Sequence, residues 1–555
     1  MKTNSKRILI VGGVAGGAAC AARLRRLDEA AEIQIFDRGP YVSFANCGLP
    51  YYVGGVIEDE KKLLVASAEL FRERFRIKVQ TGTEVVEINR AEQTIAVRKL
   101  ASGEVRLERY DALVLSPGAS AVRPALPGID LPGIFTLRTI PDSRVIRQWL
   151  EERRVEKAVV VGGGFIGLEM AENLVRRGVQ VTIVEMLSQV MAPLDPEMAA
   201  MVEKHLEAQG VKLCLSEGVS GFASNGFGGL EVETQSGRRH EADLVILAIG
   251  VRPETALAKA AGLEIGARGG IRVDGKMRTS DARIWAVGDA VEVQDWTTKQ
   301  YTLLPLAGPA AREGRIAAEV ICGRDSEFRG VQGTAICGVF GWQVAATGAN
   351  EKSLKRAGYE DFEKIYLHPF QHAGYYPGAK KMHLKVLFRK SDGRLLGAQG
   401  VGPEGVDRRI DVIAMAIQKE GTVFDLEEAE LCYAPQFGGA KDAVNFAGMI
   451  AANVLRGDLP IVHWSEATTP STVFLDVRDA DEYAEGHKAG SVNIPLGELR
   501  DRMSELSATG DLRVYCAVGQ RGYLATRILL QHGYRVRNLS GGWMLAPYVR
   551  EPKAL

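Results

Sequence analysis

Two cysteines stand in sequence contexts that favour reactive thiols. Cys47 lies in the segment Tyr41–Tyr51, a run of small and turn-forming residues that starts four residues after the acidic Asp37. Cys516 lies near the other end of the chain, after an apolar run and before Ala-Val-Gly-Gln-Arg521. The thiolate is the nucleophilic form of cysteine, and positive groups, helix N-termini and backbone N–H groups stabilise it. The sequence therefore predicts sulfur chemistry at two separate places.

The composition is that of a large globular protein without net charge. Its 555 residues suggest roughly three or four domains. The 69 basic and 69 acidic residues cancel, so no global field attracts nucleic acid or an anionic membrane surface. The seven cysteines form no CxxC pair and no His/Cys cluster of zinc spacing, so no metal site is predicted. Unpaired cysteines, the absence of a signal-peptide pattern and the absence of a membrane-spanning apolar run predict a cytoplasmic protein.

The N-terminal segment has the pattern of a dinucleotide-binding βαβ unit. A strand over 7–12 leads into the turn Gly12-Gly-Val-Ala-Gly-Gly17, a helix over 18–27 follows, and the next strand ends at Asp37. The glycines permit a tight turn and close approach of a pyrophosphate, and the acidic residue can bond ribose hydroxyls. Val14 replaces the middle glycine of the usual GxGxxG, so this turn alone also fits other α/β proteins.

A second unit follows the same pattern without that defect. A strand that begins at Lys157 leads into Gly162, Gly164 and Gly167, which give GxGxxG, and after a helix the next strand runs to Glu185. A carboxylate at that position accepts bonds from an unmodified ribose and repels a 2′-phosphate, and no Arg or Lys directly follows it. NADH is therefore favoured over NADPH.

Three further apolar strands end in glycine, at Gly118, at Gly250 and at Gly288-Asp289. The last carboxylate can hold the ribityl hydroxyls of a flavin. With these strands, residues 5 to about 450 resemble the two-dinucleotide flavoprotein disulfide reductases. The resemblance implies FAD on the first unit and NAD(P)H on an inserted second unit.

The expected fold class is α/β, with two Rossmann-like domains, an α+β dimerisation domain and an α/β rhodanese domain. The last part of the chain resembles a rhodanese domain, with Cys516 to Arg521 as its active loop. Backbone N–H groups of that loop, together with Arg521, are expected to form an anion nest that stabilises a thiolate or persulfide. The expected division is an FAD-binding domain of residues 1–120 and 251–328, an NAD(P)H-binding domain of residues 121–250, a dimerisation domain of residues 329–455, a linker of residues 456–468 and a rhodanese domain of residues 469–555.

The segment around Cys47 resembles the single-cysteine branch of the family, which contains coenzyme A-disulfide reductases, NADH oxidases and NADH peroxidases. Members with an internal disulfide carry a second cysteine five residues on, where this chain has Tyr52, so Cys47 must pair with an outside sulfur or become oxidised itself. A helix after Cys47 is expected to stabilise its thiolate. The resemblance also implies a homodimer in which Tyr375 and Tyr433 of the other subunit protonate a departing thiolate, with Tyr376 as the alternative to Tyr375.

Three features favour the coenzyme A members of this branch, and the segments that carry Tyr375 and Tyr433 are one of them. Arg23, Arg25 and Arg26 offer cations where the phosphates of coenzyme A can lie, although a solvated helix face is the simpler interpretation. None of the eight histidines lies on the first helix, where a peroxidase pattern requires one. The residues expected to bind cofactors are Gly12, Val14, Ala15, Gly16, Gly17, Arg23, Arg26, Asp37, Arg38, Ser43, Asn46, Ser116, Gly118, Gly162, Gly164, Phe165, Ile166, Gly167, Glu185, Gly250, Gly288, Asp289, Pro305, Leu306 and Ala307.

The leading hypothesis is an FAD-dependent oxidoreductase that uses NADH to reduce coenzyme A persulfide, polysulfide or coenzyme A disulfide through Cys47. A rhodanese domain handles sulfane sulfur, so Cys516 is expected to load sulfur, and the pantetheine arm is expected to carry it to Cys47. One alternative is an NADH oxidase or peroxidase in which Cys47 cycles as a sulfenic acid. Another is a sulfur-carrier or redox-sensing protein without turnover.

Overall fold

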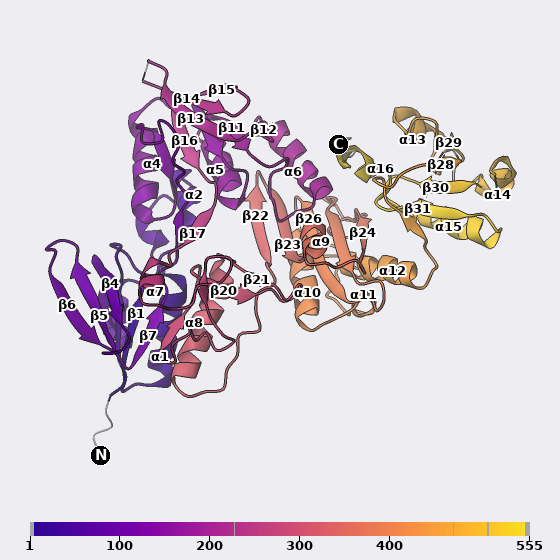
Figure 1. Cartoon of the computed structure of the whole chain (residues 1–555). Coiled ribbons are helices and arrows are strands. Elements are labelled where there is room, and N and C mark those ends of the chain that lie inside the picture. Colours follow the sequence, from indigo (N-terminus) through magenta and orange to yellow (C-terminus); the bar gives the residue numbers. More distant parts are fainter. Residues whose placement is uncertain (1–4, 227, 470, 508–509, 550–555) are drawn as a thin grey trace. The chain divides into compact units, whose positions relative to one another are not determined.

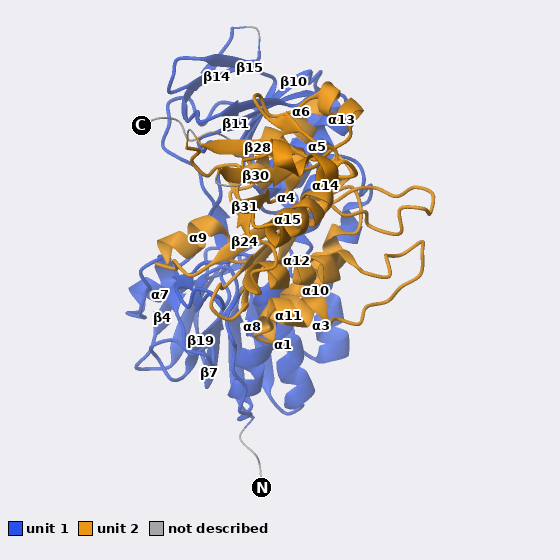
Figure 2. Ribbon diagram, turned by 90° about the vertical axis from the view of Figure 1, so that its right-hand side faces the viewer, with its two compact units in different colours: residues 1–188, 210–331 blue, residues 189–209, 332–555 orange. Residues whose placement is uncertain are grey.

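The computed structural model describes residues 5–226, 228–469, 471–507 and 510–549, so the outermost residues of the expected terminal domains lie outside the described chain. The chain divides into two compact units: residues 1–188 with 210–331, and residues 189–209 with 332–555 (Figure 2). The units contain the parallel sheets, the antiparallel sheet and the covering helices that the sequence predicts, which confirms the α/β class.

Unit 1 contains two five-stranded parallel sheets, with strand orders β19-β7-β1-β2-β3 and β12-β11-β10-β16-β9 (Figure 1). Their central strands are almost fully buried, as is typical of parallel sheets covered on both faces. The strands of the first sheet are β1 (Arg7–Val11), β2 (Glu32–Phe36), β3 (Lys78–Gln80), β7 (Ala112–Leu115) and β19 (Ile284–Ala286). Those of the second are β9 (Ile134–Thr136), β10 (Lys157–Val161), β11 (Gln180–Glu185), β12 (Lys212–Leu215) and β16 (Leu244–Leu247).

The helix after β1 and the helix after β10 both begin inside the glycine turns, and the first begins three residues earlier than the predicted residue 18. These helices are α1 (Ala15–Leu27) and α5 (Phe165–Arg176). A Cβ on Gly17 would lie 1.9 Å from the Gly12 carbonyl oxygen, and a Cβ on Gly167 would lie 2.0 Å from that of Gly162. Only glycine permits this close approach between the helix and the end of the preceding strand.

The second parallel sheet is inserted in the sequence between β7 and β19 of the first sheet. The chain enters and leaves it through two adjacent strands. The strands that flank it in sequence pair antiparallel with one another, with Ala121 opposite Val251. They are β8 (Ala119–Ala121) and β17 (Val251–Pro253). The remaining strands of unit 1 are β4 (Thr83–Asn89), β5 (Thr94–Lys99), β6 (Val105–Arg109), β13 (Val219–Ser224), β14 (Leu230–Thr234), β15 (Arg239–Ala242), β18 (Ile271–Arg272), β20 (Val291–Gln294) and β21 (Tyr301–Thr302). Its other α-helices are α2 (Leu49–Val53), α3 (Ala68–Phe75), α4 (Ile140–Glu152), α7 (Ala256–Ala260) and α8 (Ala307–Ile321).

Unit 2 begins with an antiparallel sheet of order β22-β23-β26-β25-β24, against which α10 packs. The first two strands of this sheet form a hairpin that turns at Phe340 and Gly341, both with positive φ. The strands are β22 (Ala335–Val339), β23 (Trp342–Gly348), β24 (Glu363–Leu367), β25 (His383–Phe388) and β26 (Leu395–Gly402). The helices of this part are α6 (Pro196–Ala208), α9 (Glu351–Arg356), α10 (Val406–Gln418), α11 (Val423–Glu427) and α12 (Ala443–Leu455).

The last part of unit 2 is a five-stranded parallel sheet of order β27-β31-β30-β28-β29. Its edge strand lies in the segment expected to be a linker, so that segment contributes to the sheet. The strands are β27 (Ile461–Val462), β28 (Thr472–Asp476), β29 (Val492–Asn493), β30 (Asp511–Tyr515) and β31 (Val536–Leu539). The helices are α13 (Ala480–Glu485), α14 (Leu499–Arg502), α15 (Gln520–Gln531) and α16 (Gly542–Leu545).

A fully buried lysine joins α6 to the antiparallel sheet of unit 2. Lys385 Nζ lies 2.8 Å from Asp195 Oδ2 and also bonds Glu197 and Glu351. These three carboxylates are close enough together for a metal ion, but the ammonium group already compensates their charge. The cluster is therefore a structural ion network.

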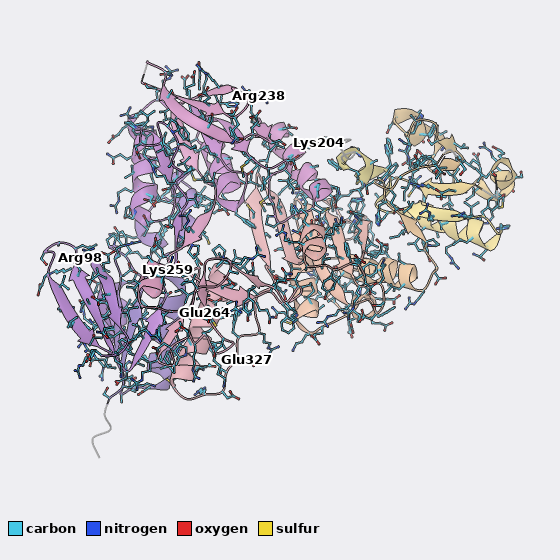
Figure 3. The ribbon with its side chains drawn as sticks, viewed as in Figure 1. Arg98, Lys204, Arg238, Lys259, Glu264 and Glu327 are labelled. Carbon is cyan, nitrogen blue, oxygen red and sulfur yellow. The ribbon has the colours of Figure 1, made fainter. Side chains whose placement is uncertain are left out.

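The surface carries charged side chains of both signs, such as Arg98, Lys204 and Glu327, in agreement with the zero net charge (Figure 3). Within the described ranges, no helix combines the length and the apolar composition needed to cross a membrane.

Candidate functional site

Cys47 is held beside the first glycine turn. It is an exposed residue in a 3₁₀ turn, Asn46–Gly48, directly before α2. The Ser43 N–H donates to the Gly13 carbonyl at 2.8 Å, with Ser43 in the left-handed region at φ 45°. Asn46 Nδ2 donates to the Arg138 carbonyl at 3.3 Å. These bonds fix both the start of the segment and the residue before the thiol.

The chain alone does not favour the Cys47 thiolate. Desolvation and the negative charge of Glu169 raise the pKa of Cys47, and the opposing effects of its own backbone N–H and of Arg138 are smaller. The helix that follows, α2, has only five residues. The prediction that this helix stabilises the Cys47 thiolate is therefore wrong, because the groups of the chain together raise the pKa of Cys47.

Glu169 is a feature of this site that the sequence analysis missed. Its carboxylate accepts a hydrogen bond from the Tyr51 hydroxyl at 3.2 Å, and burial raises the pKa of Glu169 to about 7. α2 packs closely on α5, where a Cβ on Gly54 would lie 2.1 Å from Asn173 Oδ1. Glu169 lies two residues after the last glycine of the second GxGxxG. That position could have indicated it from the sequence.

Each predicted ribose-binding carboxylate is anchored at its strand end. Asp37 accepts bonds from the N–H groups of Gly13 and Gly39, both at 2.8 Å, and burial raises the pKa of Asp37. Glu185 accepts bonds from the N–H groups of Gly163 and Leu187, both at 2.7 Å. A Cβ on Gly164 would meet no atom within 4 Å, so the N-terminus of α5 faces open space. The anchored carboxylate at each strand end, Asp37 or Glu185, fits a dinucleotide bound on the neighbouring glycine turn.

A third group of predicted residues meets at the same edge of the first sheet. The Ser116 hydroxyl accepts the Gly17 N–H at 3.0 Å, and Arg138 donates to Asp289 Oδ2 at 2.6 Å. The Gly288 N–H donates to Glu313 at 2.6 Å, and burial raises the pKa of that carboxyl to about 7. Arg138 and Glu313 lie far from the glycine motifs in sequence, and no local signal indicated them. The donors, carboxylates and glycines fit the ribityl and pyrophosphate part of a flavin dinucleotide.

The other predicted cofactor residues lie at the same strand ends and helix starts. Pro305 and Leu306 precede the first residue of α8, Ala307. α1 and α8 lie side by side (Figure 1). A Cβ on Gly314 would lie 2.3 Å from the Gly16 carbonyl oxygen. Val14, Ala15 and Gly16 lie at the start of α1, Phe165 and Ile166 open α5, and Gly118 and Gly250 follow β7 and β16 with positive φ.

The basic residues of α1 have different environments. Arg25 is buried, and its guanidinium donates to backbone carbonyls that include those of Phe75 and Ala31. Its expected role as a phosphate ligand is therefore wrong. Arg23 is paired with Glu319 on α8, and Arg26 is exposed. Outside this helix, Arg38 lies 3.8 Å from Glu254 and is largely exposed.

In unit 2, the two predicted tyrosines meet although they are 58 residues apart in sequence. Their hydroxyl oxygens are 2.9 Å apart, and both residues are exposed. The hydrogen bond to Tyr433 raises the pKa of Tyr375. Tyr376 instead packs edge-on against the His372 ring, with centroids 5.5 Å apart. The structure thus pairs Tyr433 with Tyr375 and not with the alternative.

Cys516 directly follows β30 and opens a loop that leads into α15. Its side chain is almost fully buried, and its sulfur accepts the Gly519 N–H at 3.2 Å. The Cys516 carbonyl accepts the Trp543 N–H at 2.7 Å, so the first turn of α16 holds the start of the loop in place. One N–H group of the predicted nest, that of Gly519, is directed at the sulfur, and the rest of the nest stays a prediction. Arg521, however, is bound to carboxylates and is not an open cation.

The chain belongs to the pyridine nucleotide-disulphide oxidoreductase family. The family description "Pyridine nucleotide-disulphide oxidoreductase" matches residues 6–314, and its dimerisation domain matches residues 334–443. The description "Rhodanese-like domain" matches residues 463–545. These matches confirm the resemblances seen in the sequence.

Three relatives are similar over most of the chain. Coenzyme A disulfide reductase of Staphylococcus aureus (strain bovine RF122 / ET3-1) is 36% identical over 443 residues, which cover 80% of this chain and 99% of the relative. The structure of reduced Bacillus anthracis CoADR-RHD is 46% identical, covers 99% of both chains and has a TM-score of 0.96. An NAD-dependent persulfide reductase from A. fulgidus is 37% identical, covers 97% of this chain and 99% of that chain, and has a TM-score of 0.91.

The electrostatic coupling between Glu169 and Cys47 gives a test. Because Glu169 is ionised above about pH 7 and its charge raises the pKa of Cys47, Glu169→Gln should lower that pKa. The expected shift is about 0.5 to 1 pH unit. The measurement is the pH dependence of alkylation of the Cys47 peptide, followed by mass spectrometry. Glu58→Gln removes an exposed charge from the segment after α2 and serves as the control. Equal shifts in both variants, or no shift in either, would contradict the coupling.

Proposed function

We propose that this protein uses NADH to reduce coenzyme A persulfide, polysulfide or coenzyme A disulfide through Cys47. The observation that carries the proposal is the exposed thiol of Cys47, whose segment is bound to a dinucleotide-type glycine turn, with a buried tyrosine, Tyr52, where a second thiol would complete an internal disulfide. A thiol without an internal partner takes its second sulfur from a substrate. The names of the similar coenzyme A disulfide reductase and persulfide reductase support that choice of substrate.

The cofactors follow from the two glycine turns. FAD is assigned to the sheet that ends in Asp37 and Asp289, and NADH to the sheet that ends in Glu185. When bound, FAD passes electrons from NADH to sulfur. The chain's own residues hold the two dinucleotides through backbone N–H groups and strand-end carboxylates. The domain division proposed for this purpose is the one expected from the sequence, except that Ile461–Val462 of the expected linker belongs to the last parallel sheet.

The proposed reaction at Cys47 is a thiol–disulfide exchange. The Cys47 thiolate attacks the coenzyme A sulfur of the persulfide, a Cys47–coenzyme A disulfide forms, and hydrosulfide leaves. With coenzyme A disulfide the leaving group is coenzyme A thiolate. Two electrons from NADH and one proton then restore the Cys47 thiolate and release coenzyme A. The exposed Arg26 is the cation of α1 that remains open to the phosphates of coenzyme A, because Arg23 is already paired.

We assign the proton of the last step to the tyrosine pair. Tyr375 and Tyr433 share one hydrogen bond and are exposed on unit 2, where a second subunit can use them. The matching dimerisation domain supports a homodimer in which each pair serves Cys47 of the other subunit. A phenol whose oxygen is already hydrogen-bonded to another phenol is well placed to donate to a departing thiolate.

Cys516 is proposed to accept sulfane sulfur before it reaches Cys47. The loop N–H groups at its sulfur stabilise a thiolate or persulfide, and the pantetheine arm of coenzyme A carries the sulfur onward. All seven cysteines are free thiols, which fits a reducing compartment such as the cytoplasm.

Single substitutions separate the two thiols. Cys47→Ser should abolish NADH oxidation with both coenzyme A disulfide and coenzyme A persulfide. Cys516→Ser should leave coenzyme A disulfide reduction unchanged, because that substrate carries no sulfane sulfur, and should lower turnover with polysulfide at least tenfold. The loss of NADH absorbance measures both coenzyme A disulfide reduction and turnover with polysulfide. Unchanged polysulfide turnover in Cys516→Ser would contradict the transfer from Cys516, and activity in Cys47→Ser would contradict the whole proposal.

The tyrosine pair is tested by removing one hydroxyl at a time. Tyr433→Phe and Tyr375→Phe should each lower kcat for coenzyme A disulfide by about ten- to a hundredfold, since general acid catalysis contributes on that scale. Formation of the Cys47–coenzyme A disulfide, followed by mass spectrometry without NADH, should stay the same. Tyr376→Phe is the matched control, because its ring packs on His372 and its hydroxyl is not part of the pair. An equal loss in Tyr376→Phe would argue against the assignment.

A further inference from the structure

A buried turn joins the Cys516 loop to the antiparallel sheet of unit 2. The turn consists of residues 540–542, between the end of β31 and the first residue of α16, and its two glycines have positive φ. A Cβ on Gly542 would lie 2.6 Å from the Cys516 carbonyl oxygen and 2.8 Å from the Gly519 nitrogen. That nitrogen is the donor at the Cys516 sulfur. Because the turn and the loop leave no room for a side chain between them, a shift of the turn moves the loop.

The first turn of α16 also binds the Cys516 loop by hydrogen bonds. The Trp543 N–H donates to the Cys516 carbonyl at 2.7 Å, and the Met544 N–H donates to the Ala517 carbonyl at 2.9 Å. Both donors belong to the N–H groups that the start of a helix leaves without a partner inside the helix. Together with the close glycine contact, these bonds couple the position of the loop backbone to that of the turn.

The opposite side of the turn lies on the edge strand of the sheet, β24. A Cβ on Gly541 would lie 3.1 Å from Tyr366 Cβ, and the Tyr366 N–H donates to the Ser540 hydroxyl at 3.3 Å. His368, which directly follows β24, brings its Nε2 to 3.0 Å from the Gly541 carbonyl oxygen. A carbonyl oxygen only accepts, so His368 Nε2 carries a proton and donates it. His368 is therefore a side-chain donor that the sheet supplies to the turn.

A second histidine determines which nitrogen of His368 carries the proton. His383, the first residue of β25, places its Nδ1 2.8 Å from His368 Nδ1. Burial lowers the pKa of His368 to about 3 and that of His383 to about 4, so both rings are neutral near pH 7. A neutral imidazole has one N–H group. Since His368 uses its own at Nε2, its Nδ1 accepts, and His383 Nδ1 donates.

We propose that His368 and His383 position the Cys516 loop for sulfur transfer through the turn of residues 540–542. This inference rests on the proposed function, in which Cys516 accepts sulfane sulfur, and it adds two positioning residues that do not touch that sulfur. Hydrogen bonds are donated from His383 to His368 and from His368 to the turn. They hold the turn against the loop, and the loop keeps its N–H donor at the sulfur.

The step that depends on this geometry is the loading of Cys516. Its thiolate attacks the terminal sulfur of a polysulfide, and the neighbouring sulfur–sulfur bond breaks. A Cys516 persulfide anion and a polysulfide shorter by one sulfur form, so atoms and charge balance. The N–H donor at the sulfur stabilises the negative charge of the thiolate, so a displaced donor slows loading. The proposed exchange at Cys47 involves no residue of this loop and serves as an internal reference.

The test replaces His368 with side chains that lose or keep its donor. His368→Leu removes the donor to the turn, whereas His368→Gln keeps an N–H group on a side chain of similar reach. Polysulfide is added to the full-length holoenzyme without NADH, the thiols are alkylated, and mass spectrometry follows the gain of one sulfur on the Cys516 peptide. His368→Leu should load about three- to tenfold more slowly than the wild type, the effect of one lost hydrogen bond expressed as a rate ratio. His368→Gln should recover most of the wild-type rate.

Substitutions of His383 test the assigned proton positions. His383→Leu should also slow loading, because His368 can then carry its proton on Nδ1 and lose the bond to the turn. His383→Asn should restore the rate, since its side-chain amide can donate to His368 Nδ1. NADH turnover with coenzyme A disulfide should stay at the wild-type level in all four variants and so report intact folding. His532→Leu removes an exposed imidazole that bonds only within α15 and its C-terminal end, and this control should load like the wild type.

The outcomes separate this inference from the proposed function. Wild-type loading in both leucine variants would overturn the inference while the proposed function stands. An equal loss in His368→Leu and His368→Gln would overturn it as well, because the donor would then have no effect of its own. If His368→Leu does not fold, His383→Leu and His383→Asn decide by the same comparison. A wild type that does not load Cys516 from polysulfide would contradict both the proposed role of Cys516 and this inference.

Discussion

The attachment of the Cys47 segment to the first glycine turn is the constraint on which the rest of the site depends. The Ser43 N–H donates to the carbonyl of Gly13, and the N–H of Gly13 donates to Asp37, so the thiol segment and the predicted ribose ligand are both bound to the same residue. The turn itself exists only because glycine lets α1 approach the end of β1 within less than a side chain's width. A larger residue there would displace the thiol and the dinucleotide site together.

The two thiols lie in contrasting electrostatic environments. Cys47 is exposed, yet desolvation and the charge of Glu169 oppose its ionisation. Cys516 is buried, and its sulfur receives a backbone N–H. This difference suits the proposed division of labour. A thiol that must wait for a substrate disulfide gains from not being fully ionised at rest, because resting thiolates are oxidised readily. A thiol that stores a persulfide needs its stabilising donors in place at all times.

Patterns local in sequence predicted the framework of the site well. The glycine turns, the strand-end carboxylates Asp37 and Glu185, and the loop after Cys516 all follow from short motifs whose spacing dictates geometry. Residues whose roles depend on remote partners were missed or misinterpreted. The sequence predicts that Arg25 is a surface cation, but its guanidinium is buried and donates to the carbonyl of Phe75, which lies 50 residues further along the chain. The sequence predicts that Arg521 binds an anion, but in the structure Glu482 of α13 binds its guanidinium. Chain-distant pairing of this kind leaves no periodic signal in a single sequence.

The central claim is that Cys47 exchanges with a coenzyme A sulfur and that NADH reverses the exchange. The most direct measurement is mass spectrometry of the intact protein, purified without thiol reductant and incubated with coenzyme A disulfide, before and after addition of NADH. The account predicts one coenzyme A bound as a disulfide on Cys47 and its complete release by NADH. Cys47 found as a sulfenic acid, with no coenzyme A on the protein and rapid NADH oxidation by oxygen alone, would contradict it and select the oxidase.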